Sequence, residues 1–280
     1  MAYNPRMISA QDSRRLVWRP LAELPRRYEL VRSLVRKELA ARYRGSALGP
    51  VWVLLRPAVM ISIYTFIFAG VFGARFGANG TARDYALYLF CGLLPWTAFQ
   101  ESVQTSATVI VTHSNLVKRV VFPLETLPLS LAFAAHVTQL FGMLVLVAAT
   151  VVMQGELHLT ILWLPVLLLP QLLASLGASW LAASLGVFLR DTEQAAGLLL
   201  TAWLFLTPII YPEQAVPARY QFYVNLNPFT PLVRNYRRTV LEGLPPDWSG
   251  LAYFTLFALL SFILGYWWFA RTRKNFADVV

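Results

Sequence analysis

Residues that commonly perform catalysis or bind metal ions are few in this chain, and their spacing matches no known catalytic arrangement. The histidines His113, His136 and His158 lack the H-x-x-x-H or H-E-x-x-H spacing that puts two imidazole ligands on one helix face. The sequence holds neither a G-x-x-x-x-G-K-[ST] loop, which would bind the phosphates of ATP, nor a G-x-S-x-G turn, which would present a nucleophilic serine. We therefore expect no catalytic residue, no metal site and no cofactor in this chain.

Two charged residues fall where the surrounding sequence is apolar. Glu101 interrupts a long uncharged stretch, where a charge costs about 2.5–3.5 kcal/mol on membrane-insertion scales. It is therefore either the partner of a basic residue, a protonated acid, or a functional group of the membrane interior. Arg56 lies near the start of another uncharged stretch, and its guanidinium either reaches back to lipid phosphate or serves a functional site.

Aromatic residues form a second kind of candidate site. Tyr64, Phe68 and Phe72 recur every four residues, which places them on one face of a helix. Such a stripe either packs against helices and lipid or lines a pathway for sugars, whose apolar C–H faces stack on aromatic rings. Trp180 and Trp203 lie in the middle of apolar stretches, away from the membrane interfaces that tryptophan favours, and are candidates for the same pathway.

The composition indicates which kind of protein must position these residues. Of the 280 residues, 57% are hydrophobic and only 14% are charged, whereas a soluble domain has about 25% charged residues. The single cysteine excludes a disulfide scaffold, and the net charge of +10 is spread along the chain rather than gathered on a nucleic-acid-binding domain. We predict an all-α polytopic membrane protein that does not bind nucleic acid.

Stretches without Asp, Glu, Lys or Arg predict six transmembrane helices. They cover roughly residues 51–73, 86–110, 126–153, 160–188, 195–211 and 249–270. Residues 1–50 then form an N-terminal arm, residues 51–270 the transmembrane domain and residues 271–280 a tail. Of the 24 basic residues, 17 fall on the side of the two termini and six on the other, so the positive-inside rule places both termini in the cytoplasm.

Three further segments are neither spans nor simple loops. Residues 29–44 have apolar side chains at helical spacing among arginines, which predicts an amphipathic helix that lies on the inner membrane surface or packs on protein. Residues 112–125 (THSNLVKRVVFPLE) are either a solvated loop or a short helix that offers an apolar and basic surface to a cytosolic partner. Residues 212–247 are too long for a bare loop and predict a re-entrant external helical hairpin between the fifth and sixth spans.

The second helix of that hairpin is predicted to start at Thr230 and Pro231 and to have two faces. Its apolar face contains Leu232, Val233, Tyr236, Val240 and Leu241. Its polar face contains Arg234, Arg237, Arg238 and Glu242.

Five short runs, taken in this order, resemble the type-2 ABC exporter permeases that export lipid-linked polysaccharides (O-antigen, capsule and teichoic acid). They are residues 41–52 (ARYRGSALGPVW) with Arg56-Pro57, residues 115–119 (NLVKR) with Phe122-Pro123, residues 188–191 (FLRD), residues 207–211 (TPIIY) and residues 227–231 (NPFTP). The resemblance covers roughly residues 36–275.

The resemblance implies a homodimer in the bacterial inner membrane that recruits two copies of a separate ABC ATPase. ATP and Mg²⁺ would then act through that partner. It further implies that residues 29–44 are the interface helix and that the ATPase-coupling residues are Asn115, Leu116, Val117, Lys118 and Arg119. The substrate would be a polysaccharide on an undecaprenyl-diphosphate anchor.

Basic residues are candidates for binding the diphosphate of that anchor. They are Arg44 and Arg56 on the inner side, and Arg234, Arg237 and Arg238 on the outer side. Two alternatives stay open: a permease of the same superfamily that exports a drug or small lipid, and a membrane-bound transferase. The aromatic stripe and residues 41–57 argue against the first, and the missing acid or histidine cluster argues against the second.

Overall fold

The computed structural model describes residues 24–42, 44–67, 82–118 and 122–280, and this part of the chain is helical without a strand. The α-helices are α2 (Tyr28–Arg42), α3 (Trp52–Tyr64), α4 (Ala82–Thr112), α5 (Ser114–Val117), α6 (Thr126–Gln154), α7 (Leu164–Phe188), α8 (Thr192–Leu206), α9 (Ala218–Leu226), α10 (Phe229–Val240), α11 (Trp248–Thr272) and α12 (Phe276–Val279). Short 3-10 turns are η1 (Leu24–Arg27), η2 (Gly49–Val51), η4 (Leu159–Trp163), η5 (Glu213–Ala215) and η6 (Arg273–Asn275). The predicted all-α class is confirmed for these residues.

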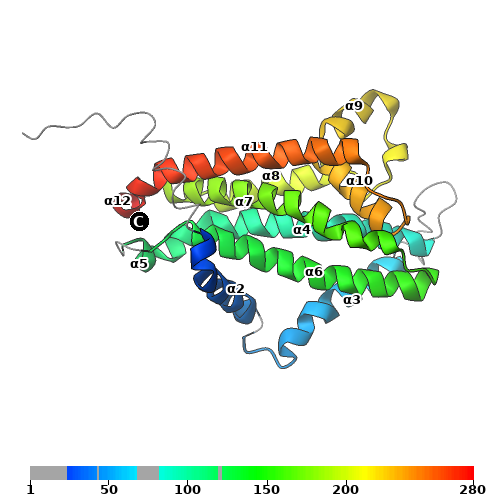
Figure 1. The fold of residues 1–280 in the computed structure, drawn as a ribbon, viewed down its shortest axis with the longest axis horizontal. Coiled ribbons are helices and arrows are strands. Elements are labelled where there is room, and N and C mark those ends of the chain that lie inside the picture. Colours follow the sequence, from blue (N-terminus) through cyan, green and yellow to red (C-terminus); the bar gives the residue numbers. More distant parts are fainter. Residues whose placement is uncertain (1–23, 43, 68–81, 119–121) are drawn as a thin grey trace, which may run out of the picture.

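Four long helices, α4, α6, α7 and α11, lie side by side and form the body of the molecule (Figure 1). Glycines allow α7 and α11 to approach closely, because a Cβ on Gly177 would overlap the backbone of Ser261 and a Cβ on Gly265 would overlap the backbone of Gly177. Helix packing inside membranes depends on such small residues, since lipid tails are as apolar as the side chains and supply no hydrophobic driving force.

A helix occupies each of the six predicted span positions, but not all of these helices could cross a membrane alone. Among the described residues, three helical stretches are long and apolar enough: Thr126–Gln154, Leu159–Phe188 and Trp248–Val279. Trp52–Ile67 is a shorter apolar helix, and residues 68–73 of the predicted first span lie outside the described part of the chain. The count of six spans therefore stays a prediction.

The predicted fifth span, residues 195–211, is too long at its end: α8 stops at Leu206. Thr207 caps the helix with its N–H bonded to the carbonyls of Trp203 and Leu204, and its backbone is extended. The reason is Pro208, which disfavours helical backbone at the preceding residue and lacks an N–H of its own. Ile209 is nevertheless fully buried, so this turn is an internal part of the fold.

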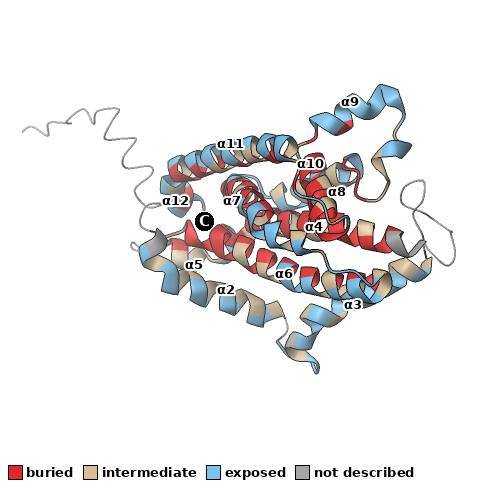
Figure 2. Ribbon diagram, turned by 45° about the vertical axis from the view of Figure 1, so that its right-hand side comes forward, coloured by how far each residue is buried: buried red, intermediate tan, exposed pale blue. Residues whose placement is uncertain are grey.

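The predicted amphipathic helix is present as α2, and it packs along the first half of α6. At its start, Arg27 forms an ion pair with Glu125, the residue before α6. At its end, Arg42 donates to the hydroxyl of Thr138, three turns further along α6. No residue of α2 is fully buried, and one face of the helix is exposed (Figure 2). Its placement at the membrane surface stays a prediction.

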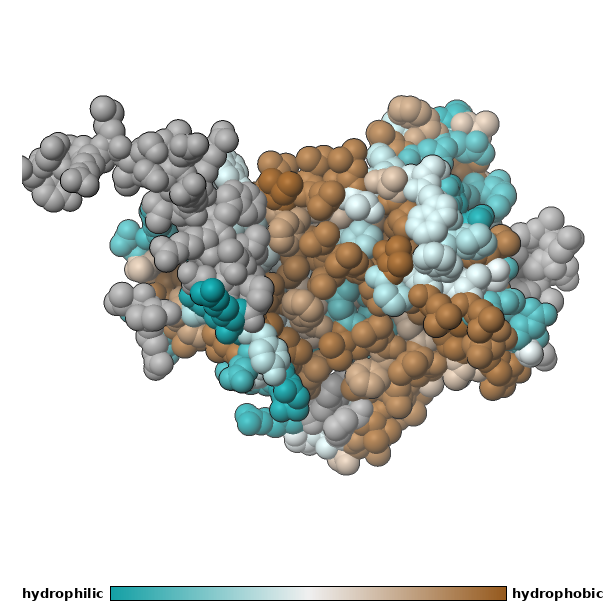
Figure 3. Space-filling view, in the orientation of Figure 1, coloured by the Kyte–Doolittle hydropathy of each residue, from teal (hydrophilic) through white to brown (hydrophobic). Residues whose placement is uncertain are grey.

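Elements expected on opposite sides of the membrane lie at opposite ends of the bundle. Helices α5 and α12 and the C-terminus lie at one end, and the α9–α10 pair lies at the other (Figure 1). In the space-filling view, hydrophobic residues cover the middle of the visible face, whereas hydrophilic residues gather over α2 and near α9 (Figure 3). This distribution agrees with a membrane-embedded body, while the orientation of its ends stays a prediction.

Candidate transport groove and coupling surface

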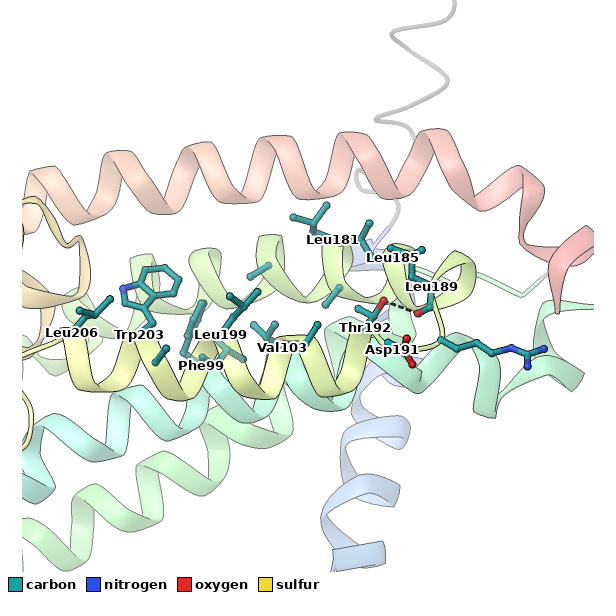
Figure 4. A pocket seen from close by; sticks show the side chains of 17 residues that line it. Phe99, Val103, Leu181, Leu185, Leu189, Asp191, Thr192, Leu199, Trp203 and Leu206 are labelled. Atoms are coloured by element: carbon teal, nitrogen blue, oxygen red, sulfur yellow. Dashed lines mark hydrogen bonds between the residues drawn. The ribbon is translucent and has the colours of Figure 1, made fainter.

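A groove of about 800 Å³ runs between α4, α7 and α8. Its walls are almost entirely apolar, with Phe99 and Val103 from α4, Leu181 from α7, and Leu199 and Trp203 from α8 (Figure 4). The polar residues of the α7–α8 turn close one end of the groove; they are Arg190, Asp191 and Thr192. The groove therefore offers a long apolar surface with aromatic rings, bounded by charge at one end.

Trp203 is held firmly in this wall. Its indole Nε1 donates to the side-chain oxygen of Asn227 at 3.0 Å, and its ring lies 5.2 Å from the ring of Phe229 in an edge-to-face arrangement. The same Asn227 oxygen accepts the N–H of Phe229 at 3.0 Å, and its amide donates to Thr207 at 2.8 Å. Asn227 therefore fixes the start of α10 and the end of α8 together, and with them the position of Trp203.

The other predicted pathway residues do not gather around this groove. Trp180 is fully buried, donates its Nε1–H to the backbone carbonyl of Glu125 at 3.1 Å and packs 4.9 Å from the ring of Tyr266. Tyr64 is half-buried, with its ring 5.7 Å from that of Phe90. Phe68 and Phe72 lie outside the described residues. Of the predicted set, Trp203 lines the groove, and the transport role of all five stays a prediction.

The predicted coupling segment forms a short helix, α5, at the same end of the molecule as the C-terminus. Its apolar side is anchored, because Val117 is buried and Leu116 packs against the same hydrophobic cluster, which includes Phe276 of α12. Its polar side is free, because Asn115 and Lys118 are exposed. Arg119 lies outside the described residues, and docking of an ATPase here stays a prediction.

Glu125, the residue before α6, is one that sequence reasoning missed. Only 2% of its side chain is exposed, and its two carboxylate oxygens bind Arg27 at 3.6 Å and Arg273 at 3.3 Å. It thereby ties the start of α2, the end of α11 and the start of α6 into one unit. The sequence does contain a signal for this residue. Glu125 is an acidic residue that follows Pro123 and directly precedes the uncharged stretch 126–155.

The arginines proposed for a lipid diphosphate have different surroundings. Arg44 and Arg56 are exposed. Arg234 is partly exposed and bonds Glu213 at 2.7 Å, while Arg238 donates to the carbonyl of Pro245 at 3.1 Å. Among the described contacts, no two of these four arginines share an acceptor.

The prediction that Arg237 lies on the polar face of its helix is wrong. Its side chain is 4% exposed, and its guanidinium donates to the carbonyls of Tyr88 at 3.2 Å, Pro208 at 2.8 Å and Ile209 at 3.0 Å. The turn after α8 leaves carbonyls that no helix satisfies, and such groups must find a donor when they are buried. Arg237 supplies that donor, which explains its burial.

Two further polar contacts join helices, of which the first is partly exposed and the second is buried. Glu101 forms an ion pair with Arg42 of α2, which is the basic partner that the sequence left open. Gln139 of α6 and Gln171 of α7 exchange hydrogen bonds of 3.1 and 2.7 Å, and both bond the hydroxyl of Tyr236 on α10. The signal for this network was a glutamine in the middle of each of two uncharged stretches, which sequence reasoning did not use.

Asp247, a titratable group outside the predicted spans, has a shifted pKa. Asp247 precedes α11 and accepts bonds from the hydroxyl and N–H of Ser249 and from the N–H of Gly250. These donors, chiefly the Ser249 hydroxyl, lower the pKa of Asp247. The carboxylate thereby caps the start of α11. Among the described residues, no group of three or more His, Cys, Asp and Glu is placed to hold a metal ion.

Comparisons with known proteins agree with this architecture. The family model described as ABC-2 type transporter matches residues 29–241. The chain is 30% identical over 254 residues to the O-antigen export system permease protein RfbA of Myxococcus xanthus, and 27% identical over 255 residues to the protein of that name in Klebsiella pneumoniae; each alignment covers 90% of this chain and 95% of the relative. It is 25% identical to the polysialic acid transport protein KpsM of Escherichia coli, over 88% of this chain and 93% of the relative.

Proposed function

The chain belongs to the ABC-2 type transporter family, and from this premise we propose that it is the permease subunit of an ATP-driven polysaccharide exporter in the bacterial inner membrane. The observation that carries the proposal is near-full-length similarity to permeases named for O-antigen export. The proposed cargo is a polysaccharide on an undecaprenyl-diphosphate anchor, moved from the cytoplasmic to the outer leaflet.

The groove between α7 and α8 supports this cargo chemically. Sugar rings present apolar C–H faces, and the rigid ring of Trp203 offers a surface on which such a face can stack. In a homodimer, two such grooves would form one pathway, which a single chain of this size would not enclose.

Energy for movement would come from two copies of a cytosolic ABC ATPase with bound ATP and Mg²⁺. The proposed docking element is α5, since its apolar side is anchored and Asn115 and Lys118 face outward. Because α5 packs with α12, and Val117 belongs to the same buried cluster as Leu127 of α6 and Phe269 of α11, a push on α5 would reach α6, α11 and α12 together.

The diphosphate of the lipid anchor would meet arginines that are still accessible. These are Arg44 and Arg56 at one side and Arg234 and Arg238 at the other. Arg237 was a candidate by sequence, but its guanidinium already donates to three backbone carbonyls, and we assign it to the fold.

The test is reconstitution of the chain with its cognate ATPase in proteoliposomes that contain the lipid-linked glycan. We expect ATP-dependent appearance of the glycan on the trans side, and none with an ATPase that binds but cannot hydrolyse ATP. Movement of small lipids or drugs without movement of the glycan would favour the alternative exporter and overturn the proposal.

The proposed coupling surface is tested by reversing the exposed charge of Lys118. A charge reversal at the opposite end of the bundle serves as the control. Lys118→Glu should reduce capture of the ATPase by the tagged permease and lower the transport rate. The matched control is Arg219→Glu on α9, which reverses a similarly exposed charge at the opposite end and should leave both unchanged. Equal capture by wild type and Lys118→Glu would refute docking at α5.

A further inference from the structure

A second groove, of about 590 Å³, lies on another part of the molecule, beneath α2. Helix α2 forms one wall with Val31 and Val35, and the facing walls come from α6, α7 and α11. These last three helices are the ones long and apolar enough, among the described residues, to cross a membrane. The groove is therefore part of the lipid-embedded body and separate from the groove between α7 and α8.

The shape of the groove suits a hydrocarbon chain. On α6 its wall consists of Leu129, Phe133 and Val137, which recur every four residues and so run along the helix. At 1.5 Å per residue these positions extend over about 12 Å. Leu176 and Phe262 continue the apolar wall on α7 and α11. An acyl chain can bind in such an apolar slot because it has no hydrogen-bonding groups. A peptide would bind less well, because its backbone N–H and C=O groups would lose their hydrogen bonds to water there.

The rim of the groove carries two available positive charges. Arg32 and Arg36 line it from α2, lie one helical turn apart and are exposed. Other arginines of this region are occupied, since Arg27 pairs with Glu125 and Arg42 with Glu101. In the described part of the chain, neither Arg32 nor Arg36 takes part in an ion pair. Two guanidinium groups beside an apolar slot match a phosphate joined to an acyl chain.

We propose that this groove is a binding site for one anionic phospholipid of the membrane. The acyl chain lies along the wall formed by Leu129, Phe133 and Val137, and the phosphate binds Arg32 and Arg36. Bound there, the lipid fills the space between α2 and the spans and holds α2 against α6. Binding of this lipid does not depend on the polysaccharide cargo, so a failure of this proposal would not contradict the proposed function.

The experiment measures lipid binding to the detergent-purified full chain by native mass spectrometry. The probes are dioleoyl phosphatidylglycerol, which is anionic, and dioleoyl phosphatidylcholine, which has the same acyl chains and no net charge. We expect one phosphatidylglycerol to bind with a preference of about 25-fold, because each of the two basic residues next to the anionic headgroup contributes about fivefold. Arg32→Gln/Arg36→Gln should abolish this preference.

The matched control is Arg26→Gln/Lys37→Gln, which removes two exposed charges from the same region without touching the groove. It should keep the preference for phosphatidylglycerol. A second pair of variants tests the slot: Val35→Trp fills the groove and should prevent binding of the tightly held lipid, whereas Ala40→Trp, at an exposed position of α2, should not.

Three results would overturn the proposal. They are an equal loss of preference in the two charge variants, unchanged binding in Val35→Trp, and displacement of phosphatidylglycerol by equimolar undecaprenyl diphosphate, which would assign the groove to the cargo anchor. Folding of every variant is checked by its thermal unfolding temperature, and a variant that unfolds at the wild-type temperature but loses the lipid supports the site.

Discussion

Glu125 joins three parts of the chain at the end of the bundle that carries α5, α12 and the C-terminus. Its carboxylate lies between Arg27 and Arg273, and its backbone carbonyl accepts the indole N–H of Trp180. The arginines are about a quarter to a third exposed, so water already solvates part of their charge. The carboxylate itself is buried, and removing its charge leaves both arginines without that partner.

We predict that Glu125→Gln destabilises the protein by about 2 kcal/mol, less than the roughly 3–5 kcal/mol lost when a fully buried pair is broken. Thermal unfolding of the purified protein in detergent would show a lower midpoint. The matched control is Glu156→Gln, since Glu156 is 70% exposed and should contribute almost nothing. Equal midpoints for the two variants would contradict the role of Glu125.

Arg237 illustrates how one side chain can complete an irregular backbone. Hydrogen bonds from a charged donor contribute about 1.5–3 kcal/mol each when the acceptors are buried. We predict that Arg237→Gln lowers stability by at least about 3 kcal/mol, because a glutamine amide cannot reach three carbonyls at once. Arg238→Gln, which loses one bond near the surface, should cost under about 1 kcal/mol. Comparable unfolding midpoints in both variants would disprove the assignment.

At the scale of elements, the contact between α7 and α11 depends on glycine. Because a side chain at Gly177 would overlap the backbone of Ser261 and Phe262, no flexible group can move aside to accept it. We predict that Gly177→Leu separates the two helices and costs more than the roughly 1–3 kcal/mol typical of overpacked cores. Yield and unfolding midpoint in detergent measure this, with Ala252→Leu on the exposed side of α11 as the control that should behave like wild type.

Helix α8 is a short apolar helix with several exposed leucines. Its 15 residues extend about 22 Å, which is shorter than the roughly 30 Å hydrocarbon core of a bilayer. Leu198 is 74% and Leu199 68% exposed, and the groove lies beside them. A helix shorter than the hydrocarbon core is accommodated by thinning of the bilayer or by oligomerisation, and a second copy of the chain beside α8 would provide the latter.

At the scale of the whole molecule, we therefore predict a dimer with α8 near its axis. In a Cys91→Ala background, Leu198→Cys should form covalent dimers when membranes are treated with a short thiol-reactive cross-linker. Leu260→Cys, exposed on α11, should not. Cross-linking of both positions to the same extent, or of neither, would contradict this arrangement.

The sequence alone determined the helical class, the positions of the main helices and the family resemblance. It could do so because uncharged stretches of sufficient length specify helices in a membrane regardless of their neighbours. The amphipathic helix 28–42 and the helix pair after residue 217 were also predictable, since apolar spacing and proline act over a few residues. The predicted end of the fifth span at residue 211 lies beyond the end of α8 at Leu206, because Pro208 disfavours helical backbone at the residue before it.

Tertiary structure alone decided which polar side chains are structural. Arg237 and Arg238 are neighbours of the same type, yet one binds buried carbonyls and the other lies near the surface. Glu125 finds arginines from both ends of the chain, and Glu101 finds one on α2. These partners are distant from each other in sequence. Which carbonyls and charges become buried and need a partner is decided only when the helices pack together, so no local sequence pattern encodes it.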